Sequence, residues 1–188
     1  MRIISGSFKG KKILEPRDKK TRPLKDLTKE SIFNIITHSK KIKINLSKAK
    51  ILDLFSGVGS FGLECLSRDA KQVIFIENYK EVLNILKKNL FNLKLANNYE
   101  IIKKNIYENK TFSLLKTRFD IIFLDPPYKD KNLEKKFIKI KKFKLLNNKG
   151  IVILHRHKNE KNLLPLNFKI IEEKKYGISK IYFIKYLK

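Results

Sequence analysis

From residue 50 onward, short apolar segments alternate with amphipathic ones, and no other feature of the sequence constrains the fold as strongly. Val82, Leu86 and Leu90 recur at spacings of four, and residues 133–143 show the same helical period. The apolar runs around such segments are KILDLF (50–55), QVIFIE (72–77), YEIIKK (99–104), FDIIFLD (119–125) and GIVILHR (150–156). Nearly continuous apolar strands that alternate with helices predict a mostly parallel sheet, covered by helices on both faces.

Two further apolar runs, 168–174 and 180–186, close the sequence without a helical pattern between them. Only a turn at Tyr176-Gly177 separates them, so we expect an antiparallel hairpin at one edge of the sheet. The predicted sheet therefore has seven strands.

The first 40 residues follow a different pattern. Residues 2–4 and 12–14 flank Gly6 and Gly10 and predict a β-hairpin, while the apolar residues between 26 and 38 suit a helix that faces a core. We therefore predict a Rossmann-like α/β domain over residues 41–188 and a hairpin-helix extension over residues 1–40.

A glycine-rich loop follows the first predicted strand. The stretch DLFSGVGSFG (53–62) places a G-x-G-x-x-G pattern between a strand and a helix, and Glu77 ends the next strand 20 residues after Gly57. Glycines let the backbone approach a ligand closely, and an acidic residue at that distance can accept hydrogen bonds from ribose hydroxyls. The combination favours an adenosine-type cofactor over a plain tight turn.

The residue types around this loop indicate which cofactor it is. A nicotinamide needs a site for hydride transfer, which the sequence does not suggest. S-adenosylmethionine instead carries an ammonium and a sulfonium, so a carboxylate beside the loop suits it, and Asp53 supplies one. A carboxylate that only caps the local turn remains the alternative for Asp53.

The fourth predicted strand ends in Asp125-Pro126-Pro127-Tyr128, which is either a turn or a site. Residues before proline are extended, and prolines cannot donate to a sheet ladder, so the chain leaves the sheet stiffly beside the glycine loop. Open α/β sheets bind ligands at this edge. The Asp125 carboxylate and Pro126 carbonyl match the two donors of an exocyclic amine, and a base stacked on Tyr128 gains about 1–3 kcal/mol. We interpret the motif as a site.

The net charge indicates the partner. With 44 Lys and Arg against 18 Asp and Glu, the chain carries +26. An AT-rich genome explains many lysines, but it does not require so few carboxylates, and a polyanionic partner relieves the repulsion. Nucleic acid is therefore the expected partner.

The remaining composition excludes several classes. A single cysteine, Cys65, on the apolar face of a predicted helix rules out an internal disulfide and indicates packing, and three scattered histidines argue against a zinc site. His155 and His157 lack a third ligand, so we expect no metal. No apolar run approaches the roughly 18 to 20 residues that span a bilayer, and the N-terminus lacks a signal-peptide pattern. We expect a cytoplasmic protein and no membrane partner.

Several motifs in order resemble one family. RIISGSFKGKKI, TRPLKDLTKESIFNII, LDLFSGVGSFGLECLSR, FLDPPY and YGISKIYF are similar to segments of the RsmD family, bacterial 16S rRNA guanine-N2 methyltransferases. The resemblance covers nearly the whole chain, whereas DPPY alone is shared with DNA amino-methylases. It implies a class I methyltransferase fold, S-adenosylmethionine as cofactor, S-adenosylhomocysteine as product, and the small ribosomal subunit as partner of a monomeric enzyme.

The resemblance also assigns residues. Its catalytic residues are Asp125, Pro126, Pro127 and Tyr128. Its cofactor-binding residues are Asp53, Phe55, Ser56, Gly57, Gly59, Glu77, Asn78, Asn105, Ile106 and Asp125, with Asn105 and Ile106 beside the adenine. Its RNA-binding residues are Arg2, Lys9, Lys11, Lys12, Arg22 and Lys25. The chain departs from the family where Asn105 replaces a common Asp, where Asp69 replaces a glycine, and where His155 replaces an acidic residue.

The predicted reaction is methyl transfer to the N2 amine of a guanine in 16S rRNA. Two alternatives stay open. One is a DNA adenine-N6 or cytosine-N4 methyltransferase, although 188 residues leave little room for a target-recognition domain. The other is a non-catalytic RNA-binding factor of ribosome assembly.

Overall fold

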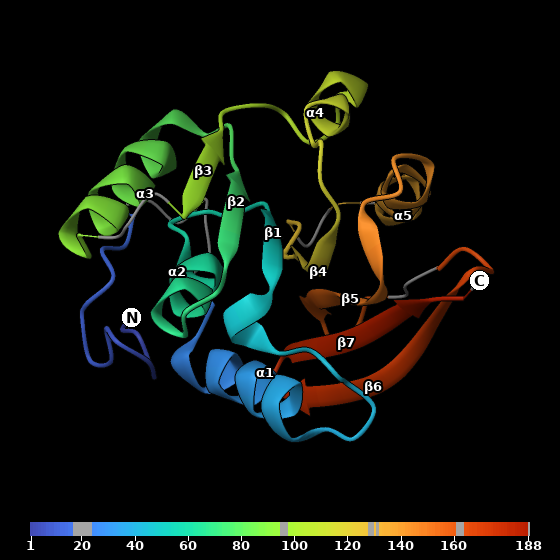
Figure 1. The fold of residues 1–188 in the computed structure, drawn as a ribbon, viewed down its shortest axis with the longest axis horizontal. Coiled ribbons are helices and arrows are strands. Elements are labelled where there is room, and N and C mark those ends of the chain that lie inside the picture. Colours follow the sequence, from blue (N-terminus) through green and yellow to red (C-terminus); the bar gives the residue numbers. More distant parts are fainter. Residues whose placement is uncertain (17–23, 95–97, 128–129, 131, 161–163, 188) are drawn as a thin grey trace.

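A computed structural model describes residues 1–16, 24–94, 98–127, 130, 132–160 and 164–187. Its strands form one sheet in the order β3-β2-β1-β4-β5-β7-β6 (Figure 1). The strands are β1 (Lys50–Leu54), β2 (Gln72–Ile76), β3 (Tyr99–Ile102), β4 (Phe119–Leu124), β5 (Leu146–His157), β6 (Phe168–Tyr176) and β7 (Ser179–Tyr186). The helices are α1 (Asp26–His38), the short 3-10 helix η1 (Leu46–Lys48), α2 (Ser60–Ser67), α3 (Lys80–Asn92), α4 (Asn109–Ser113) and α5 (Leu133–Lys142).

The strand directions confirm the predicted architecture. Strands β1 to β5 pair in parallel, whereas β7 pairs antiparallel with both β5 and β6. Strand order reverses at β1, which lies between β2 and β4. In sheets of this kind the carboxyl ends of the strands at the reversal form the ligand site.

Three elements differ from the sequence prediction. Strand β5 begins at Leu146 rather than at residue 150, because the polar segment 146–149 joins the sheet through a register shift opposite Phe119 and Ile121. Helix α4 and η1 were not predicted, since five and three residues are too few to show a helical period.

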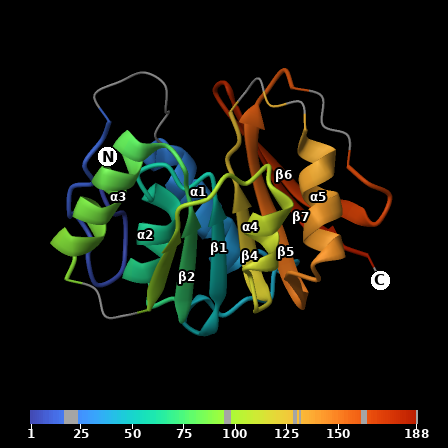
Figure 2. The ribbon, with the colours of Figure 1, turned by 90° about the horizontal axis from the view of Figure 1, so that it is seen from above.

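The sheet separates two apolar clusters, one on each face. Helices α1, α2 and α3 lie on one side, and α4 and α5 lie on the other (Figure 2). Neighbouring residues of a strand alternate between the clusters: Ile51 and Asp53 face the first group of helices, and Leu52 and Leu54 face the second. Both faces of the central strands are therefore dry, which explains the continuous apolar runs.

The predicted N-terminal β-hairpin is reduced to a single bridge, between Arg2 and Lys12. The ladder stops because the following backbone groups bond to α2 instead. The amides of Ile4 and Ser5 donate to the Glu64 carboxylate at 2.8 and 3.0 Å, and the Ser7 amide donates to the Ser67 carbonyl at 2.7 Å. The segment still folds back on itself, because the Ile3 amide donates to the Lys11 carbonyl at 2.9 Å and the Ile13 amide to the Met1 carbonyl at 3.0 Å, and it is also docked on α2.

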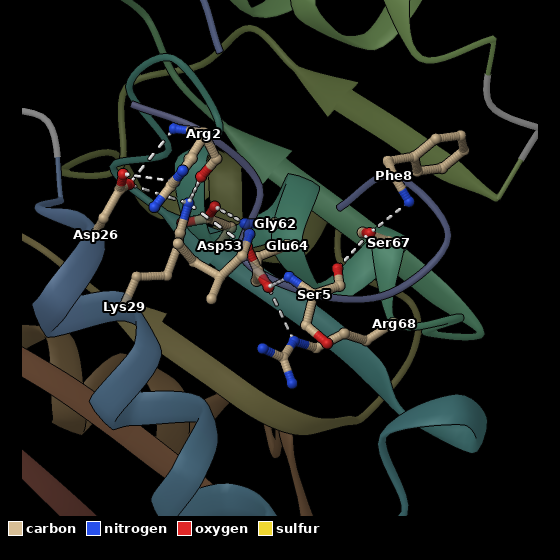
Figure 3. Close-up of polar contacts among 11 residues, drawn as sticks. Arg2, Ser5, Phe8, Asp26, Lys29, Asp53, Gly62, Glu64, Ser67 and Arg68 are labelled. Atoms are coloured by element: carbon tan, nitrogen blue, oxygen red, sulfur yellow. Dashed lines mark hydrogen bonds and ion pairs between the residues drawn. The ribbon is translucent and has the colours of Figure 1, made fainter. Parts of the chain in front are cut away.

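Glu64 joins this segment to the domain (Figure 3). Its buried carboxylate accepts a bond from Arg68 Nε at 3.0 Å and lies 3.5 Å from the Lys29 ammonium. Lys29, on α1, is fully buried and also donates to the Arg2 carbonyl at 2.6 Å. All eight residues of α2 are buried as a result, with the sheet on one side and the N-terminal segment on the other.

Candidate functional site

The glycine loop leaves β1 at its carboxyl end and starts α2. Gly57 and Gly59 have positive φ angles of 56° and 87°, a region that favours glycine. A Cβ on Gly59 would lie 2.4 Å from Leu86 Cδ1, so this position also lacks space for a side chain. The Ser56 amide bonds to the Ile76 carbonyl at 3.1 Å and ties the loop to β2.

Phe55, the first residue of the loop, has a positive φ of 61° although it is not glycine. Its ring contacts the Tyr107 ring edge-on, with centroids 6.0 Å apart. The loop therefore meets the segment that follows β3 through an aromatic pair.

Asp53 is buried under this loop and has one oxygen without a partner. Its Oδ2 accepts the Gly62 amide at 3.1 Å, as expected for a turn cap (Figure 3). Its Oδ1 has no hydrogen-bond partner among the described residues. Burial raises the pKa of Asp53, and the nearby carboxylates of Asp125 and Glu77 raise it further. A buried, unpaired carboxylate oxygen fits a cationic ligand group such as an ammonium.

Glu77 lies at the end of β2 and fastens the loop to α3. Its Oε2 accepts the Gly57 amide at 2.9 Å, and its Oε1 accepts the amides of Asn78 and Tyr79 at 2.8 and 2.9 Å. The predicted ribose contact is compatible with this arrangement at Oε2, which accepts one amide and keeps a second lone pair, whereas Oε1 already accepts two. The contact itself stays a prediction, as does that of the exposed Asn78.

The predicted adenine residues follow β3. Asn105 Oδ1 accepts the Tyr107 amide at 2.9 Å, and Ile106 is buried. A cavity of about 170 Å³ opens beside Ile106, lined also by Tyr107, Asn132, Lys135, Lys136 and Lys139. The predicted acceptor of the adenine amine is Asn105 Oδ1. It already accepts the Tyr107 amide and has one lone pair left.

The proline motif begins where β4 ends. Asp125 is partly buried, and its Oδ1 lies 2.9 Å from Nδ1 of His155 on β5. Pro126 is buried and Pro127 is exposed. Tyr128 lies outside the described residues, so its predicted stacking role stays a prediction. Asp53 and Asp125 come from adjacent strands and face the same side of the sheet.

A polar cluster behind the motif, in which Asp130, Lys136 and Arg156 are buried, escaped the sequence analysis. The Asp130 carboxylate accepts bonds from Lys136 Nζ at 2.6 Å, the Tyr107 hydroxyl at 2.8 Å and the Asn132 amide at 2.8 Å. These bonds outweigh the effect of burial and lower the pKa of Asp130. Arg156, also buried, donates to the carbonyls of Pro127 and Asp130 at 3.3 Å each. The sequence carries a signal for two of these residues. Lys136 is a cation on the apolar face of a helix, with Leu133 and Phe137, and Arg156 is a cation at the end of an apolar strand.

The predicted RNA-binding residues do not belong to this site. Arg2, Lys9, Lys11, Lys12 and Lys25 are exposed on the N-terminal segment and at the start of α1. Arg22 lies outside the described residues. The contact of these residues with RNA stays a prediction.

Three further findings concern Cys65, metal binding and membrane helices. Cys65 is buried, and burial raises its thiol pKa, so its predicted packing role is confirmed. Across the described ranges, no cluster of three or more His, Cys, Asp or Glu residues is arranged to bind a metal. Nor does the described part of the chain include a helix of the length and hydropathy needed to cross a membrane.

Comparison with known proteins identifies the family. Residues 1–185 match the family described as conserved hypothetical protein 95. Ribosomal RNA small subunit methyltransferase D from Haemophilus influenzae is 32% identical over 95% of this chain and 90% of its own length. The protein of the same name from Buchnera aphidicola (subsp. Baizongia pistaciae) is 32% identical over 100% of this chain and 91% of its own length.

Solved structures agree. The Escherichia coli protein yhhF, described as a candidate methyltransferase, superposes with a TM-score of 0.79 at 29% identity and covers 100% of this chain and 98% of its own. The chain therefore belongs to the RsmD family, and its fold is that of the class I methyltransferases.

Proposed function

We propose that this protein transfers a methyl group from S-adenosylmethionine to the N2 amine of a guanine in 16S rRNA of the small ribosomal subunit. In this proposal residues 41–188 carry the reaction, residues 1–40 contact the RNA, and the protein acts as a monomer. The observation that carries the proposal is the set of carboxylates at the ends of β1, β2 and β4, in which one Asp53 oxygen has no partner among the described residues.

The charge of this set favours a cationic cofactor. The carboxylates of Glu77 and Asp125 both repel that of Asp53, so a positive ligand beside Asp53 is favoured and a pyrophosphate would add repulsion. S-adenosylmethionine carries its methyl group on a cationic sulfur. The amine nitrogen would attack the methyl carbon in line with the carbon–sulfur bond, and S-adenosylhomocysteine would leave. Asp53 would hold the ammonium, and Glu77 the ribose.

The proline motif would hold the target amine. The Asp125 carboxylate and the Pro126 carbonyl are two acceptors on a stiff frame, because both residues precede a proline. They can accept both N–H groups of a guanine N2 amine and so direct its lone pair toward the methyl group. Such orientation supplies roughly 7–11 kcal/mol of the barrier without a covalent nucleophile. The base must be unpaired or flipped out to enter.

Relatives and charge support rRNA as the substrate. The relatives from H. influenzae and B. aphidicola carry the name of a small-subunit rRNA methyltransferase, and the net charge of +26 suits a polyanion. The exposed cations of the N-terminal segment would bind phosphates, which position the RNA without reading its sequence.

The test is methyl transfer to defined substrates. Small ribosomal subunits from a strain that lacks guanine-N2 methylation are incubated with radiolabelled S-adenosylmethionine, and the product nucleoside is identified after digestion. Label in N2-methylguanosine is expected with the wild type, and at least 100-fold less with Asp125→Ala. Glu30→Ala, which removes an exposed carboxylate from α1, serves as the control that keeps activity.

Two results would contradict the proposal. Label on DNA but not on subunits would indicate a DNA amino-methyltransferase. RNA binding without any transfer, and without cofactor binding by calorimetry, would indicate an assembly factor that retains only the fold.

A further inference from the structure

We infer that His155 is a positioning residue, which holds one oxygen of the Asp125 carboxylate so that the other faces the target amine. The inference rests on the proposed function, because it gives Asp125 a substrate amine to bind. It adds a residue from β5 to a site otherwise built from β1, β2 and β4.

The sheet itself brings the two side chains together. Leu124 of β4 and Leu154 of β5 are partners in the parallel register, so the next residues, Asp125 and His155, also lie side by side. His155 Nδ1 is 2.9 Å from Asp125 Oδ1. On its other edge β5 pairs His155 with Ile181 of β7, which fixes the histidine backbone from that side.

The distance requires a proton between the two atoms. Two lone pairs at 2.9 Å would repel, so either Nδ1 carries a hydrogen or the carboxyl group does. The histidine side chain is only 10% exposed, and its Nε2 is buried without a partner among the described residues. A proton on Nε2 would be a buried donor with no acceptor, whereas a bare lone pair there costs less. The ring therefore carries its proton on Nδ1 and donates it to Asp125.

This bond restrains the side-chain torsions of Asp125, which the backbone leaves free. Pro126 fixes the backbone around Asp125, but the carboxylate can still rotate about its side-chain bonds. The Nδ1–H donor selects one orientation, and within the described residues Oδ2 has no competing donor. The next residue, Arg156, points to the opposite face and holds the Pro127 and Asp130 carbonyls. Two successive residues of β5 thus contact the proline motif: His155 contacts Asp125, and Arg156 contacts Pro127.

A nuclear magnetic resonance measurement tests the tautomer without any assay of activity. The chain has only three histidines, His38, His155 and His157, so imidazole nitrogen-15 signals are few, and His155→Asn identifies one set. We expect His155 to be protonated on Nδ1 when neutral, and to revert to the common Nε2–H form in Asp125→Ala. An Nε2–H signal in the wild type would overturn the inference, and the proposed function would be unaffected.

Kinetics of matched variants test the positioning role. In His155→Asn the side-chain NH₂ group can occupy the position of Nδ1 and keep the bond to Asp125. In His155→Gln the NH₂ group lies near the position of Nε2, and the bond is lost. We expect kcat to fall about 10- to 100-fold in His155→Gln and His155→Leu, and less than about 5-fold in His155→Asn, with cofactor affinity unchanged. His157→Gln is the control that retains activity.

Other patterns would count against the inference. Equal losses in His155→Asn and His155→Gln, or losses that follow thermal stability, would mean that His155 only packs. Absence of transfer by the wild type would instead refute the proposed function, and with it the role of His155 in that reaction.

Discussion

Replacing Glu64 with Gln should undock the N-terminal segment from the domain. The buried carboxylate of Glu64 accepts the amides of Ile4 and Ser5 and balances the charges of Lys29 and Arg68. A glutamine keeps one acceptor, removes the charge, and turns an NH₂ group toward existing donors. Among the carboxylates that the structure describes, Lys29 then retains only the partly buried Asp26 at 3.8 Å as a counter-charge.

The expected loss follows from the burial of this pair. Glu64 and Lys29 are both inaccessible to solvent, and removing one member of such a pair costs about 3–5 kcal/mol. For a chain of this size that lowers Tm by about 6–20 °C. Burial lowers the pKa of Lys29 in the native protein, against the raising effect of Glu64. Without Glu64 the pKa of native Lys29 falls further. The unfolded variant then binds more protons than the native variant over a wider pH range. The stability difference between wild type and variant should therefore shrink as pH rises toward 10.

Urea unfolding, monitored by circular dichroism, measures the loss in free energy of unfolding. Hydrogen exchange shows which part of the chain is destabilised. The amides of Ile4 and Ser5 should lose protection before those of β1. Glu30→Gln, on the exposed face of α1, is the control and should stay within about 0.5 kcal/mol of the wild type. A Glu64→Gln protein no less stable than this control would refute the role assigned to the buried pair.

Three further predictions follow from the site. Because burial raises the pKa of Asp53 and a cationic cofactor binds its ionised form, cofactor affinity should rise with pH. Calorimetry over a series of pH values should show this rise, and Asp53→Asn should abolish it. Gly59→Ala places a Cβ 2.4 Å from Leu86 Cδ1 at a φ of 87°, so it should cost about 2–4 kcal/mol in urea unfolding; an unchanged midpoint would contradict the geometry. Changing Lys9, Lys11 and Lys12 together to Gln should reduce the slope of log K for RNA against log salt by about 2, measured by filter binding, and an equal slope would place the RNA elsewhere.

Much of the fold was predictable because its strands are dry on both faces. Runs such as FDIIFLD have no polar alternation, and only a parallel sheet between helices explains them. The N-terminal hairpin was predicted, but its docking on α2 was not, because the partner Glu64 is 60 residues away in the sequence. The polar start of β5 was missed because its pairing with β4 depends on register and not on composition.

The site was predictable only where local sequence determines it. The glycine loop and the proline motif are both dictated by backbone constraints of their own residues. His155, Arg156, Asp130 and Lys136 act through contacts between separate elements, and a histidine or a lysine alone carries no sign of its partner. The buried cations among apolar residues were the one available signal.

The position of β7 between β5 and β6 has a consequence for how the chain is made. Strand β5 borders the candidate site, but its second edge is covered only when β7, which comes after β6 in the sequence, has been synthesised. At ordinary translation rates β5 waits about 1 to 6 s with that edge open. An apolar open edge invites pairing with other chains. Slowing translation between residues 158 and 186 should therefore promote aggregation, while the same delay before residue 146 should not.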